Sequence, residues 1–419
     1  MILAQALALL VGAASAATSG RGAIDAGRPT SNSTPTATPT PTATPTPTPT
    51  AAAISTSTAP PPCPPGPLLP WPDETARVRA ARPVELAALE AYAFTLDGPD
   101  AARRGARTDG LVILHRGALT YERYGRGFGR ETPHIAWSVT KSLVGALAGV
   151  ATGEGAVSLD DSVCRHLPSA PAERCGITIR HLLEWSSGLD WQESYERSTR
   201  QASSVLAMLY GVGRRDMAAF VLGHPARAAP GAEWAYSSGD SLLLAAVLGA
   251  AMEPRHGRDW PWKVLLEPLG MERAVLERDA RGTLVGASYL WATPRELARL
   301  AQLHLRDGCW GGRRLLPAGW VRDATEVSPA LRRGSPLRKP GDVTGRALWL
   351  DRPVPELGQG VPWPGAPEDA YWMRGHWGQL VAVIPSLELV VVRTGDDRDE
   401  QAFDHDRFLA LAIAAGRLP

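Results

Sequence analysis

Lysine is scarce in this chain of 419 residues. Lys141, Lys263 and Lys339 are the only lysines among 44 basic residues, and the remaining 41 are arginines. Acidic residues number 43, so the formal net charge is +1. This balance gives no indication of nucleic-acid binding. A lysine in an apolar context therefore needs a specific explanation in this protein.

Several signatures of other protein classes are absent. No C-x-x-C pair and no H-E-x-x-H run occurs, and the nine histidines are scattered, so a metal site has no support and no cofactor is expected. No G-x-S-x-G occurs either, which excludes an α/β-hydrolase as far as a sequence can.

The N-terminus predicts export. Residues 1–17 form an apolar run that ends in Ala14-Ser15-Ala16, which fits the cleavage rule of a secretory signal peptide. No Lys or Arg precedes the run, so a misplaced start codon and an uncleaved anchor are the alternatives. We expect a periplasmic or extracellular protein.

Residues 18–72 predict a disordered linker. They contain TPTATPTPTATPTPTPT and almost no bulky apolar residues, so they cannot form a core and favour extended conformations. The linker separates the signal peptide from a domain predicted over residues 73–419, and it would allow association with the cell envelope.

Four cysteines, Cys63, Cys164, Cys175 and Cys309, allow three pairings in an exported chain if all are bridged. We favour a Cys164–Cys175 disulfide, because these two flank a short loop between segments predicted to be ordered. Cys63 lies in the linker and is a candidate free thiol.

The order of predicted elements indicates the fold class. A helix is expected at 83–96, a hairpin at 111–124, helices through the middle of the chain, and two strand-forming runs at 371–385 and 387–395 before a final helix. Both chain ends therefore contribute strands. The prediction is an α/β (α+β) fold, with an antiparallel sheet built from both ends, flanking helices and a mainly helical lobe.

Ser138-Val139-Thr140-Lys141 is the strongest candidate for chemistry. It places a hydroxyl at a predicted helix start and an amine three residues later on the same helical face. A lysine held among apolar residues has a lowered pKa and can take the serine proton, which an arginine cannot do. The alternative is a serine N-cap followed by a lysine on a solvated face.

Two later segments supply further candidates. Tyr236 comes just before an apolar helix, and the run from Gly375 to Gln379 begins a strong strand where two glycines would let a substrate lie close. Taken alone, each segment also has a non-functional interpretation. Tyr236 would be a half-buried aromatic residue, and His376 would be a surface histidine with no role.

These three segments, in this order, resemble the serine β-lactamase and penicillin-binding superfamily, whose motifs are S-x-x-K, Y-x-N or S-x-N, and K-T-G. The runs ITIRHLLEWSSGLDW and SLDDSVCRHLP also resemble that family. The resemblance covers about residues 83–419. It is closest to the branch containing 6-aminohexanoate-dimer hydrolase and the β-lactamase-like esterases.

The resemblance implies a role for each matching residue. Ser138 would be the nucleophile, Lys141 its base and Tyr236 the proton carrier. Backbone N–H groups of Ser138 and Gln379 would form the oxyanion hole. Substrate would contact Ser238, His376, Trp377, Gly378 and Trp191, within a pocket walled by nearby aromatic residues.

Departures from the family pattern favour one substrate class. The second motif lacks its final Asn, and the third has His376 where β-lactamases carry a lysine. A neutral imidazole binds a carboxylate less well than an ammonium group. We therefore expect a small-molecule ester or short linear amide as substrate. A β-lactamase or D-Ala-D-Ala peptidase, and a catalytically silent binding protein, are the alternatives.

Overall fold

The computed structural model describes residues 63, 83–196, 198–335, 341–399 and 401–417. The predicted signal peptide and, apart from Cys63, the predicted linker lie outside these residues. Within them the α-helices are α1 (Pro83–Phe94), α2 (Val139–Gly153), α3 (Val163–His166), α4 (Ile179–Leu183), α5 (Ser204–Tyr210), α6 (Met217–Leu222), α7 (Ser238–His256), α8 (Pro294–Leu305), α9 (Trp320–Ala324), α10 (Pro329–Arg332) and α11 (His405–Gly416).

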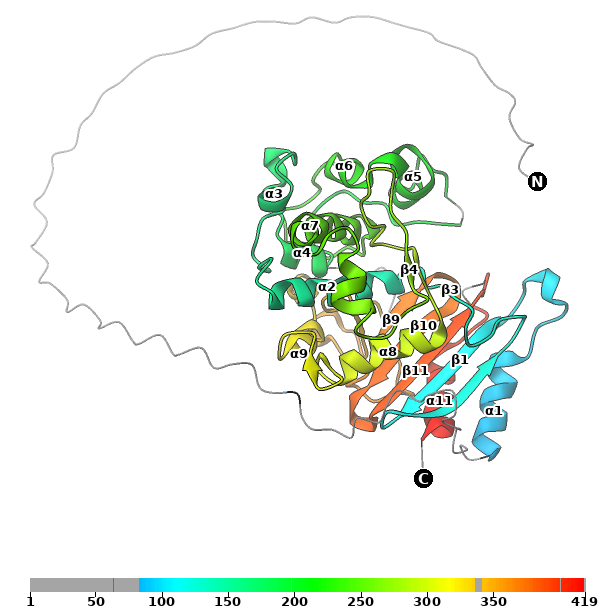
Figure 1. The fold of residues 1–419 in the computed structure, drawn as a ribbon. Helices are drawn as coiled ribbons and strands as arrows, with labels where there is room; N and C mark the ends of the chain where they lie inside the picture. Colours follow the sequence, from blue (N-terminus) through cyan, green and yellow to red (C-terminus); the bar gives the residue numbers. More distant parts are fainter. Residues whose placement is uncertain (1–62, 64–82, 197, 336–340, 400, 418–419) are drawn as a thin grey trace, which may run out of the picture. The chain divides into compact units, whose positions relative to one another are not determined.

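The main sheet is antiparallel and joins strands from both ends of the segment 83–417 (Figure 1). Its strand order is β2-β1-β11-β10-β9-β8, from β1 (Thr108–His115), β2 (Ala118–Tyr124), β8 (Trp349–Leu350), β9 (Tyr371–Gly375), β10 (Gln379–Ile384) and β11 (Leu389–Gly395). Strand β1 pairs with β11 from His115 opposite Leu389 to Thr108 opposite Gly395. The predicted fold class is confirmed.

The remaining strands form two small sheets. One has the order β3-β5-β4, from β3 (His134–Ile135), β4 (Val275–Leu276) and β5 (Leu290–Ala292). The other pairs β6 (Cys309–Trp310) with β7 (Arg313–Arg314). The first of them holds the segment that leads into α2, and so fixes the approach to Ser138.

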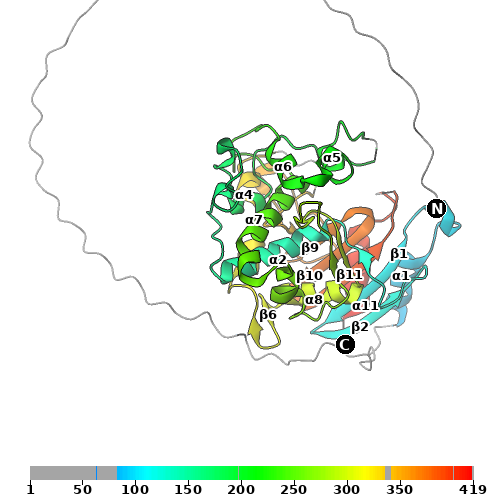
Figure 2. The same cartoon turned by 45° about the horizontal axis from the view of Figure 1, so that its top comes forward.

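Both faces of the main sheet are buried, which explains its long apolar runs. Helices α1 and α11 cover one face, and α8 with α2 covers the other (Figures 1 and 2). Along β1, Leu111 and Ile113 enter the core with α11, whereas Val112 and Leu114 enter the core with α2. Successive side chains in a strand point to opposite faces, so one strand serves two cores.

The helical lobe follows the predicted middle of the chain. Helix α7 is apolar and packs against α2, α4 and α6. Helix α8 begins at a capping box, in which Thr293 accepts from the N–H of Glu296 and Glu296 accepts from the N–H of Thr293. These strongly patterned helices are confirmed.

Two expectations need correction. The run at 371–385 is not one strand, because a 3-10 turn at His376–Gly378 separates β9 from β10. In addition, Cys63 is not free: it forms a disulfide with Cys309, while Cys164 is joined to Cys175. Since Cys309 is in β6, this bond ties the start of the described chain to the β6–β7 hairpin.

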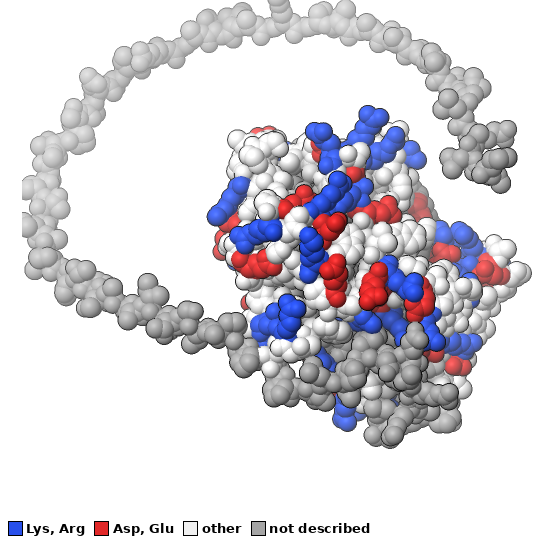
Figure 3. Space-filling model, in the orientation of Figure 1, with Lys and Arg blue, Asp and Glu red and all other residues white. Residues whose placement is uncertain are grey.

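Surface charge is mixed. On the face shown in Figure 3, basic and acidic side chains alternate over short distances. None of the helices described is long and apolar enough to cross a membrane.

Candidate active site

Ser138 lies directly before the first turn of α2. It is the N-cap residue, but its side chain makes no capping hydrogen bond. The preceding Trp137 has a left-handed backbone with φ 47°, which is unusual for a residue with a large side chain. Such strain is typical of turns whose conformation serves a function. The turn leaves the Ser138 hydroxyl directed away from the helix backbone and toward other side chains.

Lys141 lies one helical turn after Ser138 and is 2% exposed. Its Nζ donates to Ser138 Oγ at 2.9 Å and to the Ala287 carbonyl at 2.7 Å. Burial lowers the pKa of Lys141 to about 8, and the nearby Glu193 carboxylate opposes that shift. The alternative of a lysine on a solvated helix face is therefore wrong.

Tyr236 completes the arrangement from the loop before α7. Its hydroxyl hydrogen-bonds Ser138, and its ring centroid lies 5.1 Å from Lys141 Nζ. Trp185 and Trp349 pack on the ring, with centroid distances of 4.8 and 5.3 Å. Burial and the negative charge of Glu193 raise the pKa of Tyr236, so the phenol keeps its proton at neutral pH.

These groups open into a cavity of about 640 Å³. Its lining includes Ser138, Tyr236, Glu193, Tyr195, Trp349 and Arg374, together with the segment from Gly375 to Gln379. Tyr195, Trp349 and Trp377 give it aromatic walls. A cavity of this size accommodates a small organic molecule.

The third predicted motif forms one rim of this cavity. The Gln379 side chain donates to the Trp377 and Gly395 carbonyls at 3.2 and 2.6 Å, and accepts from the Gly395 N–H at 3.0 Å. These bonds fix the turn between β9 and β10 and so hold the Gln379 backbone at the pocket. Trp377 and Gly378, both with positive φ, shape the turn.

His376 faces an acid. Its Nε2 lies 2.6 Å from Glu196 Oε1, which also accepts from Trp377 Nε1 at 3.1 Å. Burial raises the pKa of Glu196, but the charge of His376 and hydrogen bonds from both rings outweigh it, and the net shift is downward. Glu196 therefore stays ionised beside the histidine at neutral pH.

Two residues predicted to touch substrate lie elsewhere. Ser238 is 1% exposed and donates through its Oγ to Glu193, and Trp191 is 5% exposed and donates to the same carboxylate. Neither lines the cavity with Ser138. Both residues lie near the cavity, but they hydrogen-bond to the buried carboxylate of Glu193 and do not line the cavity themselves.

Sequence reasoning missed Glu193, Glu196 and Arg374. Both glutamates follow Trp191 in the short run WQESYE, between the first and second motifs. Four acidic or aromatic residues in such a short run were the available signal, although a buried acid cannot be distinguished from a solvated one by spacing alone. Arg374 precedes the turn at the end of β9 and lines the cavity.

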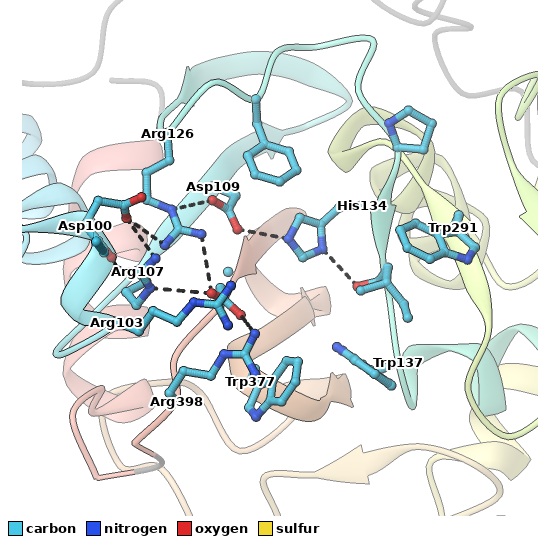
Figure 4. Close-up of a pocket in the computed structure, with 16 residues that line it drawn as sticks. Asp100, Arg103, Arg107, Asp109, Arg126, His134, Trp137, Trp291, Trp377 and Arg398 are labelled. Atoms are coloured by element: carbon cyan, nitrogen blue, oxygen red, sulfur yellow. Dashed lines mark hydrogen bonds and ion pairs between the residues drawn. The ribbon is translucent and has the colours of Figure 1, made fainter. Parts of the chain in front are cut away.

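A second cavity of about 520 Å³ lies beside the first and shares Trp377 with it. Figure 4 shows Asp109 between His134 and Arg126, at 2.9 and 2.7 Å respectively. The guanidinium of Arg398 lies 3.3 Å from the centroid of the Trp377 ring. Because Asp109 is in β1 and His134 is in β3, their hydrogen bond ties the main sheet to the segment that leads to Ser138.

No group of three or more His, Cys, Asp or Glu side chains in the described ranges is arranged to hold a metal ion. The chemistry of the first cavity is that of a serine, a lysine and a tyrosine. In such a site a nucleophile attacks an acyl carbon while neighbouring groups move protons.

The chain matches the family model for β-lactamases over residues 93–415. It belongs to the β-lactamase family. It is thus a serine hydrolase of the β-lactamase-related type.

One relative resembles this chain in sequence, and two solved structures share its fold. The 6-aminohexanoate-dimer hydrolase of Paenarthrobacter ureafaciens is 25% identical over 356 residues, which cover 78% of this chain and 90% of the relative. A putative β-lactamase from Bacteroides dorei DSM 17855 has a TM-score of 0.60 and 15% identity over 80% of this chain and 97% of its own. A family VIII carboxylesterase has a TM-score of 0.56 and 16% identity, covering 80% and 98%.

Proposed function

We propose that this protein is an exported hydrolase that cleaves carboxylic esters or short linear amides through an acyl-enzyme on Ser138. The observation that carries the proposal is the buried Lys141, whose amine lies 2.9 Å from Ser138 Oγ and whose pKa is lowered to about 8. A lysine with such a pKa is a competent base near neutral pH.

The reaction follows from these contacts. Neutral Lys141 accepts the Ser138 proton as Oγ attacks the acyl carbon. Backbone N–H groups of Ser138 and Gln379 would stabilise the oxyanion. The proton passes from Lys141 through the Tyr236 hydroxyl to the leaving group. Water then attacks the acyl carbon, the bond to Ser138 Oγ breaks, and the water proton passes through Tyr236 and Lys141 to Ser138 Oγ. Neutral Tyr236 suits the role of donor, because its raised pKa keeps the phenol protonated.

The substrate class rests on the third motif. Glu196 is held against His376 at 2.6 Å, so the residue at the position of the family lysine already has an anionic partner. A penicillin carboxylate would have to compete with it. The name of the Paenarthrobacter relative describes hydrolysis of a 6-aminohexanoate dimer, which is a linear amide. Both observations favour linear esters and amides over β-lactams.

Export is supported by two disulfides. Cys63–Cys309 and Cys164–Cys175 are both formed. Structural disulfides persist mainly in oxidising compartments, such as the periplasm and the extracellular space.

The test is the intact mass of the full chain after brief exposure to a p-nitrophenyl ester and, separately, to a penicillin. We expect an acyl adduct and rapid turnover with the ester, both lost in Ser138→Ala. A stable penicillin adduct with no ester turnover would instead support the β-lactam alternative. No adduct and no turnover in a folded sample would support the silent binding protein.

A further inference from the structure

Glu193 is a buried acid directly behind the proton carriers. It is 6% exposed and belongs to the loop between α4 and α5. Its carboxylate accepts four hydrogen bonds: Oε1 from Ser238 Oγ at 2.7 Å and Tyr195 Oη at 2.6 Å, and Oε2 from the Ser238 N–H at 2.9 Å and Trp191 Nε1 at 2.6 Å. A buried carboxylate is costly to desolvate, so this number of donors indicates a position that the fold maintains.

These bonds hold the loop that carries Tyr236. Ser238 is the first residue of α7, and Tyr236 precedes it by two positions. By binding both the N–H and the hydroxyl of Ser238, Glu193 fixes the start of α7 and therefore the place from which Tyr236 reaches Ser138. Glu193 also lines the catalytic cavity itself.

The charge of Glu193 reaches both proton carriers. Its field raises the pKa of Lys141 against the lowering effect of burial, and it adds to the effect of burial on Tyr236. The other charged groups facing this cluster are Arg374 and Asp342, which act on Tyr236, and Asp240 of α7, whose pKa burial raises to about 7. The charge of Glu193 raises the pKa of Lys141, and so opposes the lowering of that pKa by burial.

We propose that Glu193 is a positioning residue that holds the Tyr236 loop and balances the positive charge formed on Lys141 when Ser138 is deprotonated. This inference rests on the proposed function. During acylation the Ser138 proton moves to Lys141, so a neutral amine becomes an ammonium ion in a buried site. The ionised Glu193 stabilises that ion, and the charge disappears again when the proton leaves through Tyr236.

Glu193→Gln tests the charge without removing the hydrogen bonds. The two donors at Oε2 are N–H groups that cannot reverse, and a glutamine oxygen can accept from both. The two donors at Oε1 are hydroxyls, which can rotate to accept from a glutamine NH₂ group. The side chain therefore keeps all four contacts while its charge is lost.

The measurement is the pH dependence of kcat/KM for a p-nitrophenyl ester. Activity requires neutral Lys141, so it should rise with pH through about 8 in the wild type. Without Glu193 the pKa of Lys141 falls further. We expect the midpoint in Glu193→Gln to move to lower pH by roughly half a unit to one unit, as is usual for one nearby charge. A weaker base should also lower the plateau several-fold.

Two matched variants separate charge from structure. Glu193→Asp keeps the charge but shortens the side chain, so its plateau should fall while its midpoint stays near that of the wild type. Glu296→Gln removes the charge of another buried glutamate, in the capping box of α8, and should lower thermal stability without moving the midpoint.

If the wild type is active and Glu193→Gln has the same pH midpoint, the role of Glu193 is overturned and the proposed function stands. A Glu193→Gln chain that does not fold would also contradict the inference, because it would show that the fold itself requires the carboxylate. A wild type that forms no Ser138 adduct would overturn the proposed function instead.

Discussion

Lys141 shows at the residue scale how burying an amine opposes stability. Its side chain is 2% exposed, and burial lowers its pKa from 10.5 to about 8. Between these two pH values the folded chain binds fewer protons than the unfolded chain, so the free energy of unfolding rises with pH across that window. Below about pH 8 both states are protonated, and the full penalty of about 3 kcal/mol is present.

Lys141→Met should therefore abolish activity and stabilise the fold. The variant escapes the penalty but leaves the Ala287 carbonyl without its donor, at a cost of about 1 kcal/mol. We expect the free energy of unfolding to rise by about 2 kcal/mol at pH 7 and by less at pH 10. Urea unfolding at both pH values measures this. An equal change at both would show that Lys141 is not the titrating group.

At the scale of elements, one loop joins the second and third motifs. Glu193 binds Ser238 at the start of α7, and three residues later Glu196 binds His376 and Trp377 in the turn between β9 and β10. The loop therefore contacts both the start of α7, two residues after Tyr236, and the turn that carries His376.

This loop predicts how specificity can be changed. His376→Lys alone should do little, because Glu196 would pair with the new ammonium group. The double variant with Glu196→Gln leaves that group without this acid, and we expect about tenfold faster acylation by benzylpenicillin. Intact mass against time gives the rate, with Glu196→Gln alone as the control. An unchanged rate in the double variant would mean that the cavity excludes β-lactams by its shape.

The same elements show what could be predicted from the sequence. The strands β1 and β11 and the Ser138–Lys141 spacing depend on local sequence patterns, and the structure has them as expected. The turn at His376–Gly378 was missed because its flanking residues all suit a strand. Glu193 was missed because its link to the start of α7 is made through Ser238, which is 45 residues away in sequence.

At the scale of the whole molecule, one sheet separates two cores. The core containing α1 and α11 holds the two chain ends together, and the core containing α2, α7 and α8 supports Ser138, Lys141 and Tyr236. The strands of the sheet contribute side chains to both cores. The turn between β9 and β10 therefore lies against the start of α2, where the Trp377 ring packs on the Trp137 ring. The site is therefore built where the sheet and the helical lobe meet, from segments that the sequence keeps far apart.

The two disulfides constrain this molecule over very different lengths. Cys164 and Cys175 are 11 residues apart, whereas Cys63 and Cys309 are 246 apart. In the chain-entropy account a longer closed loop restricts the unfolded chain more, by about 3 kcal/mol for the short loop and about 5 kcal/mol for the long one. Neither bond involves a residue that lines the catalytic cavity.

We therefore expect Cys63→Ser/Cys309→Ser to lower the free energy of unfolding more than Cys164→Ser/Cys175→Ser, while both variants keep ester hydrolysis within about twofold at 25 °C. Guanidinium unfolding and initial rates on the same samples measure the two effects. A smaller loss for the long-range pair would mean that the chain-entropy account does not describe this bond. A large loss of activity in either variant would instead show that the bond positions the site.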